Sequence, residues 1–422
     1  MSCFYRIGVA LFLLSGMLFA QTTSSDQETI RALVQQVKEL QEKVAALEGK
    51  QVSVVATNPE TKAETPVQPP EEATNAAKGS MFREEHEIRG IQWRGFGEVN
   101  YKVLNQRQPE LGAFGFVPGS AGNFYVGDFD LYLTSRITDK ANVLAEVVIG
   151  EGDAQSFDVD LERVLFRYDY NDYFRVSTGR YHTGIGYYNS AFHSGMWVHT
   201  MASRPLIMEF ADDGGLLPTQ AVGVSITGAV PSGSLGLNYL FEYGSSDTIR
   251  PNLSGIGETD ENNGNHINVG LFARPRAIPG LQVGGSFYHD RISDFQLGPD
   301  VRLGQMIVNG HVVYNAHGIE FLNEGFWIRN AYENGGPVYN MPAFYSQFSK
   351  RFGPIRPFFR YQYVNTNPNS IYHDDVLLRH GPSFGARYDF NDAIGIKTQL
   401  DHTIRKGQPD LDGLQMQLVF AF

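Results

Sequence analysis

The stretch GLQMQLVFAF, residues 413–422, carries the pattern that decides the fold. An apolar side chain stands at every second position from Leu414 to Phe422, and Gln415 and Gln417 lie between them. A period of two predicts a β-strand whose two faces meet different surroundings. We therefore expect the sequence to end within a strand, on an aromatic residue, and ask which fold uses a strand in that way.

The same period runs through the sequence from Ile91 onward, and no segment of ten or more residues there has convincing helical spacing. In FYVGDFDLYLTSRI, residues 124–137, aspartate, threonine and arginine alternate with an apolar face, which is expected to consist of Tyr125, Phe129, Leu131, Leu133 and Ile137. A soluble β-sandwich also alternates. The strands alone therefore leave two all-β classes open.

The connections between the strands separate these classes. Seven are short and rich in Gly, Pro, Asn or Asp, namely TDKA, YNDY, VPSGS, AIPG, NAHG, FGPI and FNDA, and eight longer segments alternate with them. This arrangement predicts about sixteen strands of roughly ten residues each, the length that a tilted strand needs to cross a membrane. We expect an all-β transmembrane antiparallel β-barrel, preceded by a short N-terminal α-helical coiled coil. In it, the final strand pairs with the first, because an open edge in lipid leaves backbone groups unpaired.

Composition excludes other classes. The formal net charge is -12 and no block of clustered Lys and Arg occurs, which argues against nucleic-acid binding. Cys3 is the single cysteine and falls in an apolar leader at residues 1–20, which is typical of a secretory signal peptide. Disulfides and cysteine-ligated zinc are therefore not expected, and no cofactor or metal ion is predicted.

Two further segments precede the barrel. Residues 21–52 contain apolar positions three and four residues apart, which predict a coiled coil with the core Ile30, Leu33, Val37, Leu40, Val44 and Leu47. A solvated amphipathic helix is the alternative. The core residue types favour two strands, whereas the rest of the chain points to a trimer. Residues 53–88 have the composition of a flexible linker, and residues 89–422 are assigned to the barrel.

Three local motifs carry a resemblance to a known family: RGFGEVNY at 94–101, VSTGRYHTGIGYYN at 176–189 and ARYDFNDAIGIKTQLDH at 386–402. Together with the overall layout they resemble the trimeric bacterial porins, most closely the phosphate-selective porin O and P type. The resemblance implies a homotrimer in the lipid of the outer membrane, with the N-terminal segment in the periplasm. The heptads and linker there would allow contact with peptidoglycan. It also implies that Phe420 and Phe422 form the signal read by the barrel-assembly machinery.

The alternation supplies candidates for the inner wall and the constriction of such a channel for small hydrophilic solutes. They are Arg94, Glu98, Lys102, Asp128, Asp130, Arg136, Arg180, Arg204, Asp212, Asp213, Arg360, Arg387 and Lys397. Opposed charges across a water-filled constriction set ion preference. Ion pairs that only keep the wall polar are the alternative, and one β-bulge reverses the assignment. The stretch ERVLFRYDY, residues 162–170, resists sorting because both of its faces carry charge.

The longest connection, residues 184–219, is third in order among the long loops. In porins the loop at this position commonly folds into the barrel, so we place the constriction here. Arg180 at its root is expected to face Asp212 and Asp213 across the opening. The alternative is an outward flap whose apolar residues contact a neighbouring subunit.

Other functions compete with a general porin. An enzyme within the barrel needs a nucleophile or an activated water, a base and an orienting group, and neither His193–Ser194 nor His373–Asp375 matches a specific motif. A sugar-selective porin fits the abundance of Tyr and Phe. A tether or adhesin that does not conduct fits the heptads and linker. We expect no enzymatic activity, and the sequence does not identify the solute.

Overall fold

The computed structural model describes residues 90–106, 110–112, 115–117, 121–151, 157–193, 195–209, 216–246, 264–293, 302–367 and 376–422. The predicted leader, the coiled coil with its six core residues, and the linker lie outside the described residues. Asp212, Asp213 and the segment His373–Asp375 lie outside them as well.

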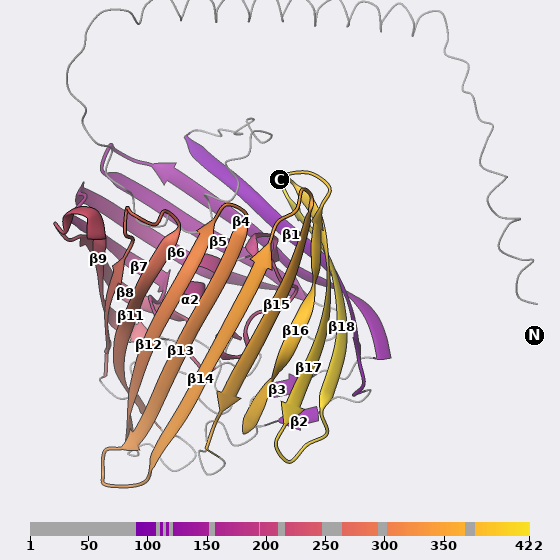
Figure 1. The fold of residues 1–422 in the computed structure, drawn as a ribbon. Helices are drawn as coiled ribbons and strands as arrows, with labels where there is room; N and C mark the ends of the chain where they lie inside the picture. Colours follow the sequence, from indigo (N-terminus) through magenta and orange to yellow (C-terminus); the bar gives the residue numbers. More distant parts are fainter. Residues whose placement is uncertain are drawn as a thin grey trace, which may run out of the picture. The chain divides into compact units, whose positions relative to one another are not determined.

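Sixteen antiparallel strands form one closed barrel in the described part of the chain (Figure 1). They are β1 (Ile91–Leu104), β4 (Ala121–Arg136), β5 (Ala141–Glu151), β6 (Phe157–Asn171), β7 (Phe174–His182), β8 (Gln220–Ala229), β9 (Leu237–Ser246), β10 (His266–Ala273), β11 (Leu281–Ser293), β12 (Arg302–Ala316), β13 (Ile319–Tyr332), β14 (Val338–Lys350), β15 (Ile355–Asn365), β16 (Leu378–Asp389), β17 (Ile394–Arg405) and β18 (Leu411–Ala421). Two short strands, β2 (Glu110–Gly112) and β3 (Gly115–Val117), pair only with each other. The predicted barrel and its strand number are confirmed.

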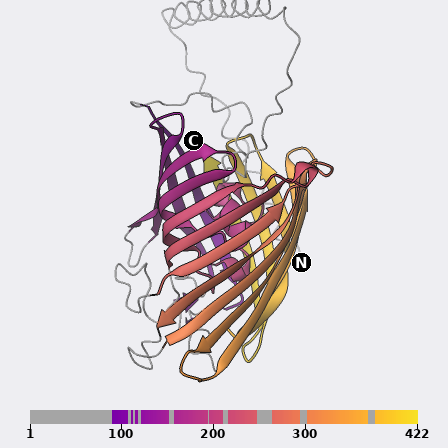
Figure 2. The same ribbon diagram turned by 90° about the vertical axis from the view of Figure 1, so that its left-hand side faces the viewer.

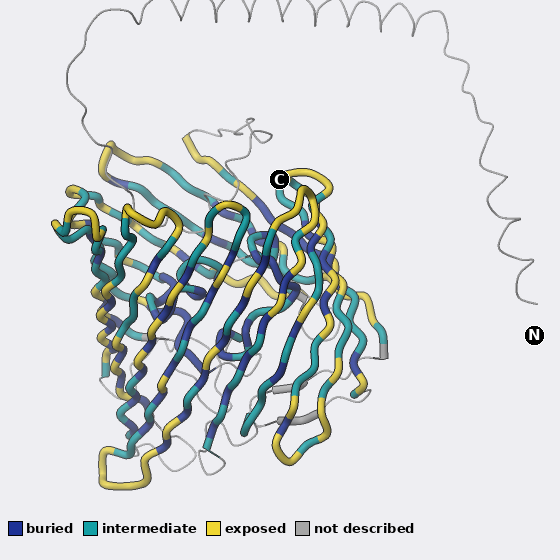
Figure 3. The backbone as a smooth tube through the Cα atoms, viewed as in Figure 1, coloured by how far each residue is buried: buried dark blue, intermediate teal, exposed yellow. Residues whose placement is uncertain are grey.

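Side chains alternate between a covered inner face and an exposed outer face along each strand. In β13, Leu322 and Phe326 are buried inside, whereas Phe321 and Trp327 are exposed outside. The alternation is visible along β12 to β14 in Figure 3, and Figure 2 shows the strong tilt of the strands. An apolar outer face on a closed barrel is the arrangement that lets β-strands cross lipid. No helix in the described segments is long and apolar enough to span a membrane.

Turn chemistry explains the short connections. His317 and Gly318 join β12 to β13 with φ values of 54° and 71°, the left-handed pair that a two-residue hairpin requires. The side-chain oxygen of Asn391 accepts hydrogen bonds from the backbone N–H groups of Ala393 and Ile394, both at 2.8 Å. Such Asx turns reverse the chain within a few residues.

The barrel closes between β1 and β18. The backbones of Gly95 and Phe422 exchange two hydrogen bonds, of 2.9 and 3.0 Å. The Phe422 ring lies over Gly95, where a side chain would overlap it, and its centroid is 5.9 Å from that of Trp93 and 5.4 Å from that of Phe129. An aromatic ring here covers the glycine and joins a girdle of rings on the outer face.

A β-bulge in β4 corrects one sequence expectation. The register of β1 against β4 shifts between Gly97 and Val99, so Val99 pairs with Val126 and Asn100 pairs with Tyr125. Asn100 is buried on the inner face, and Tyr125 therefore belongs to the inner face rather than to the lipid face. Phe124 is 78% exposed on the outer face instead. The extra residue reverses the alternation upstream of the bulge.

A second bulge lies in β6. Glu146 of β5 pairs with Arg163, but the next residue of β5 pairs with Leu161, which leaves Glu162 as the extra residue. Leu161 and Val164 are both exposed outside, although three positions separate them. This explains why charges on both faces of residues 162–170 could not be sorted by alternation.

Candidate functional site: the inward-folded loop and its anchors

The described residues of the loop at 184–219, namely 184–193, 195–209 and 216–219, lie in the interior of the barrel. The loop contains α2 (Tyr187–Phe192) and two short 3₁₀ turns, η2 (Met196–Val198) and η3 (Leu206–Met208). One group of its side chains packs on inward-facing residues of β11 to β15, and this group is Ile185, Tyr188, Ile207, Met208, Leu216 and Leu217. Trp197 packs elsewhere, against Phe96, Tyr132 and Val419 of β1, β4 and β18. Loop and wall therefore share buried apolar cores.

Buried glutamates of the wall hold the first part of the loop. Glu324 of β13 accepts hydrogen bonds from the backbone N–H groups of Tyr187 and Tyr188, at 2.6 and 2.8 Å, and from the Tyr345 hydroxyl at 2.5 Å. These N–H groups begin α2, which has no side-chain cap of its own. Since the first N–H groups of a helix lack internal partners and favour negative charge, a carboxylate from the wall stabilises the docked helix. Glu242 of β9 similarly accepts from the Gly184 N–H group at 3.0 Å.

Buried cations of the wall hold the second part. The Arg360 guanidinium donates to the carbonyl of Ser203 at 3.0 Å and to that of Arg204 at 2.9 Å. Arg387 donates to the carbonyls of Trp197 and His199, at 2.6 and 2.8 Å. Lys397 donates to two further loop carbonyls, at 2.5 and 3.0 Å. Arg360, Arg387 and Lys397, three of the predicted wall cations, thus lie beneath the loop and bind its backbone.

The other predicted wall residues are spread over different environments. Glu98 is buried beside Asn100, and Asp130 is buried beside Glu146. Arg94 is exposed, whereas Lys102 and Asp128 are half-buried. Arg136 is exposed at a short turn and forms an ion pair of 3.2 Å with Asp139.

Arg180 and Arg204 lie near the loop. Arg180 forms an ion pair of 3.3 Å with Asp160 and also donates to the side chain of Gln220. Its expected partners, Asp212 and Asp213, lie outside the described residues. Arg204 is half-buried, and its positive charge acts on the ring of His193.

Buried charges of both signs line the inner wall. Acidic side chains are buried on β1, β4, β5, β9, β11 and β13, namely Glu98, Asp130, Glu146, Glu242, Asp290, Glu320 and Glu324. Basic side chains are buried on β6, β7 and β15 to β17, namely Arg163, Arg175, Arg360, Arg387, Lys397 and Arg405. Opposed charges on the wall of a lumen orient dipolar solutes and set ion preference.

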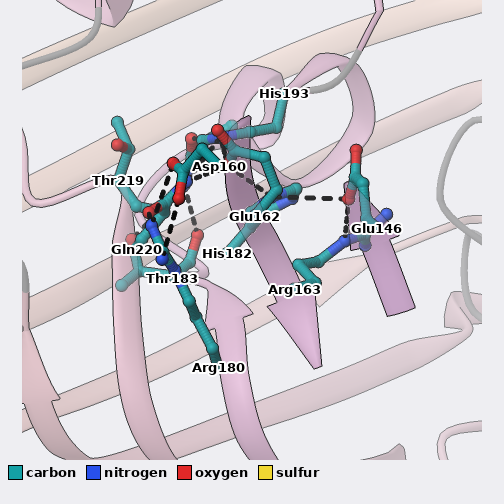
Figure 4. A network of polar contacts seen from close by, with 11 residues as sticks. Glu146, Asp160, Glu162, Arg163, Arg180, His182, Thr183, His193, Thr219 and Gln220 are labelled. Atoms are coloured by element: carbon teal, nitrogen blue, oxygen red, sulfur yellow. Dashed lines mark hydrogen bonds and ion pairs between the residues drawn. The ribbon is translucent and has the colours of Figure 1, made fainter. Parts of the chain in front are cut away.

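Histidines gather where the loop leaves the wall. His182 ends β7, and His193 follows α2. Their ring centroids are 3.5 Å apart, and the Nε2 atoms of His182 and His193 lie 3.8 and 3.4 Å from Oε2 of Glu162 (Figure 4). Glu146 and Arg163 form a buried ion pair beside them. Local patterns do not predict this cluster, because its residues come from three separate segments of the chain, β6, β7 and the loop.

No protein-family model and no curated protein matches the sequence. Solved structures share the fold. They include an anion-selective porin from Comamonas acidovorans (TM-score 0.51, 12% identity, 79% of this chain and 99% of that chain covered). The outer membrane channel DcaP of Acinetobacter baumannii gives a TM-score of 0.52 at 9% identity, with 79% and 97% covered. A loop L8 deletion mutant of OmpT, an outer membrane protein of Vibrio cholerae, gives 0.51 at 10% identity, with 79% and 100% covered.

Proposed function

We propose that this protein is an outer-membrane porin through which ions and small hydrophilic solutes diffuse passively. The observation that carries the proposal is the loop at 184–219, which enters a closed sixteen-stranded barrel and is fixed to its wall by buried charges. A barrel of this strand number encloses an aqueous lumen, and an inward loop narrows it. The shared fold of an anion-selective porin and of the channel DcaP is consistent with this proposal.

The constriction in this proposal is bounded by the loop and the facing wall. The charged groups that remain partly exposed there include Asp160, Glu162 and Arg180. Opposed charges orient a dipolar solute as it passes, while the covered cations Arg360, Arg387 and Lys397 contribute to the field without contacting it directly. Selectivity would then follow from the sum of all the wall and loop charges.

Anion or phosphate selectivity is the narrower form of the proposal. Phosphate recognition favours accessible arginines that bind oxygen atoms in pairs. Arg360 and Arg387 already donate to loop carbonyls, so Arg94, Arg180 and Arg204 are the arginines that such selectivity would use. We further propose a homotrimer, a periplasmic N-terminal segment that contacts peptidoglycan, and assembly through Phe420 and Phe422.

The test is single-channel conductance of the refolded protein in a planar bilayer, with a salt gradient to give the reversal potential. Insertions in groups of three levels support the trimer, and a positive or negative reversal potential assigns ion preference. Block by added phosphate or by oligosaccharides separates the phosphate and sugar forms. A folded, heat-modifiable barrel that never conducts contradicts the porin and favours a tether or adhesin.

A further inference from the structure

Glu162, His182 and His193 place three metal-ligand atoms close together. The two imidazole Nε2 atoms lie 3.8 and 3.4 Å from Glu162 Oε2, and all three atoms are within 4.8 Å of one another. A tetrahedral Zn²⁺ ion with bonds of about 2.0–2.2 Å holds its ligand atoms about 3.3–3.5 Å apart. We propose that these three residues form a binding site for a divalent transition-metal ion of the Zn²⁺ kind.

The hydrogen bonds around His193 fix its tautomer, with the proton on Nδ1 and the lone pair on Nε2, toward which the Gln220 amide lies at 3.4 Å. Asn189 donates through Nδ2 to the carbonyls of Thr183 and Thr219, at 2.7 and 2.9 Å, which fixes the orientation of its amide. Its Oδ1 atom lies 2.8 Å from Nδ1 of His193 and must accept a proton from it. A metal-ligating histidine characteristically donates its other ring N–H to such an oxygen.

His182 supplies an independent observation. Its side chain is only 2% exposed, and its Nε2 atom has no hydrogen-bond partner among the described residues. A buried polar atom left unpaired costs free energy, and a bound ion removes that cost. The same atom lies 3.9 Å from Glu146 Oε2, so His182 is close to a second carboxylate besides that of Glu162.

The side-chain amide of Gln220 contacts two of the three ligand atoms. Its Nε2 atom donates to Glu162 Oε2 and lies 3.4 Å from His193 Nε2, while Arg180 donates to its Oε1 atom. A metal ion would displace this amide. The imidazoles are stacked with an angle of 21° between their planes, so the His182 ring must turn for both lone pairs to meet one ion.

The donor set selects the class of metal. Two imidazoles and one carboxylate suit Zn²⁺, Co²⁺, Ni²⁺ or Cu²⁺, whereas Ca²⁺ and Mg²⁺ require mainly oxygen ligands. The ion would join the loop, through His193, to β6 and β7 through Glu162 and His182. Since Glu162 is 13% exposed, the site borders water. The ion would thus fasten the root of the loop to the wall.

The experiment uses the tag-free, chelator-treated full chain in detergent, titrated with Co²⁺ and followed by its visible absorption. We expect one ion per chain, intense bands typical of four-coordination, and displacement by Zn²⁺. His182→Gln and Glu162→Gln should each weaken Co²⁺ binding by at least about 10- to 100-fold, because loss of a hydrogen bond that merely supports a ligand already costs about that much. Gln220→Ala should tighten binding because the competing amide is gone.

His266→Gln is the matched control, because His266 is also buried on the inner wall and one of its ring nitrogens also lacks a partner in the described structure. It should bind Co²⁺ like the wild type. Heat-modifiability and circular dichroism verify that each variant folds. Octahedral-type weak bands, less than one ion per chain, or equal affinity of wild type and the His182 variant would overturn the site. Because no bilayer is involved, a metal-binding chain that does not conduct contradicts only the proposed porin.

Discussion

Replacing Glu324 by glutamine should release the loop from the wall while leaving the barrel intact. The carboxylate serves three close donors, the N–H groups of Tyr187 and Tyr188 and the hydroxyl of Tyr345, and at 3.5 Å it also accepts from the side-chain amide of Asn309. An amide of the same shape retains one acceptor oxygen and turns its NH₂ group toward a donor. One buried donor left unpaired costs about 1–3 kcal/mol, and loss of charge weakens each of the two remaining bonds by about 1 kcal/mol.

The expected sum, about 3–5 kcal/mol, raises the ratio of undocked to docked loop between about 100-fold and several thousandfold, at about 1.4 kcal/mol for each factor of ten. Single-channel recording should show a larger mean conductance with more open-channel noise, and protease should cleave the loop faster in detergent. Glu333→Gln is the matched control, since Glu333 forms a half-exposed ion pair with Arg291 that contributes little. Wild-type conductance, noise and cleavage rate in the Glu324 variant would refute the anchoring role.

Three further outcomes are expected. Lys397→Met leaves three oxygens without their donor and should lower the free energy of unfolding by about 2 kcal/mol or more, measured by heat-modifiability on gels. Gly95→Ala should slow assembly because its methyl group meets the Phe422 ring, whereas Gly325→Ala, with open space, should not; equal assembly rates would contradict the closure geometry. Burial, with positive charge nearby, lowers the pKa of His199 well below its usual 6.5, so its neutral ring contributes fully to docking above pH 6.5, and this contribution is lost as the pH falls. Open-channel noise with chelator present should therefore rise toward pH 5, and His199→Gln should flatten that rise.

Much of the barrel could be predicted because lipid and water impose a period of two on every strand. The inward side of Asn100 and the outward side of Leu418 both follow from alternation, and short turns such as that at Asn391 follow from side-chain hydrogen bonding. These effects are local, because each depends on only a few neighbouring residues. Strand number and order follow from them, since antiparallel neighbours in the sequence pair in space.

The interior could not be predicted in the same way. Tyr125 was assigned to the wrong face because no local signal announces the bulge beside it. Arg360 alternates correctly, yet alternation does not reveal that a loop more than 150 residues away in the sequence covers it. The meeting of His182 and His193 depends on the depth to which that loop folds, which is a property of tertiary packing.

The bulge at Glu162 divides β6 into two parts that present opposite parities of the sequence to lipid. Before the bulge in the sequence, the odd-numbered residues Val159 and Leu161 face outward, and after it the even-numbered residues Val164 and Phe166 do so. Deleting Glu162 itself would keep both parts correctly oriented, because Leu161 and Arg163 already pair with consecutive residues of β5. Deleting one residue within either regular part would instead turn that part of the strand inside out, sending aspartates or arginines into hydrocarbon. A deletion of equal size in a water-exposed loop would pass unnoticed. The tolerance of this chain to insertions and deletions should therefore differ strongly between strands and loops, as its tolerance to substitutions does.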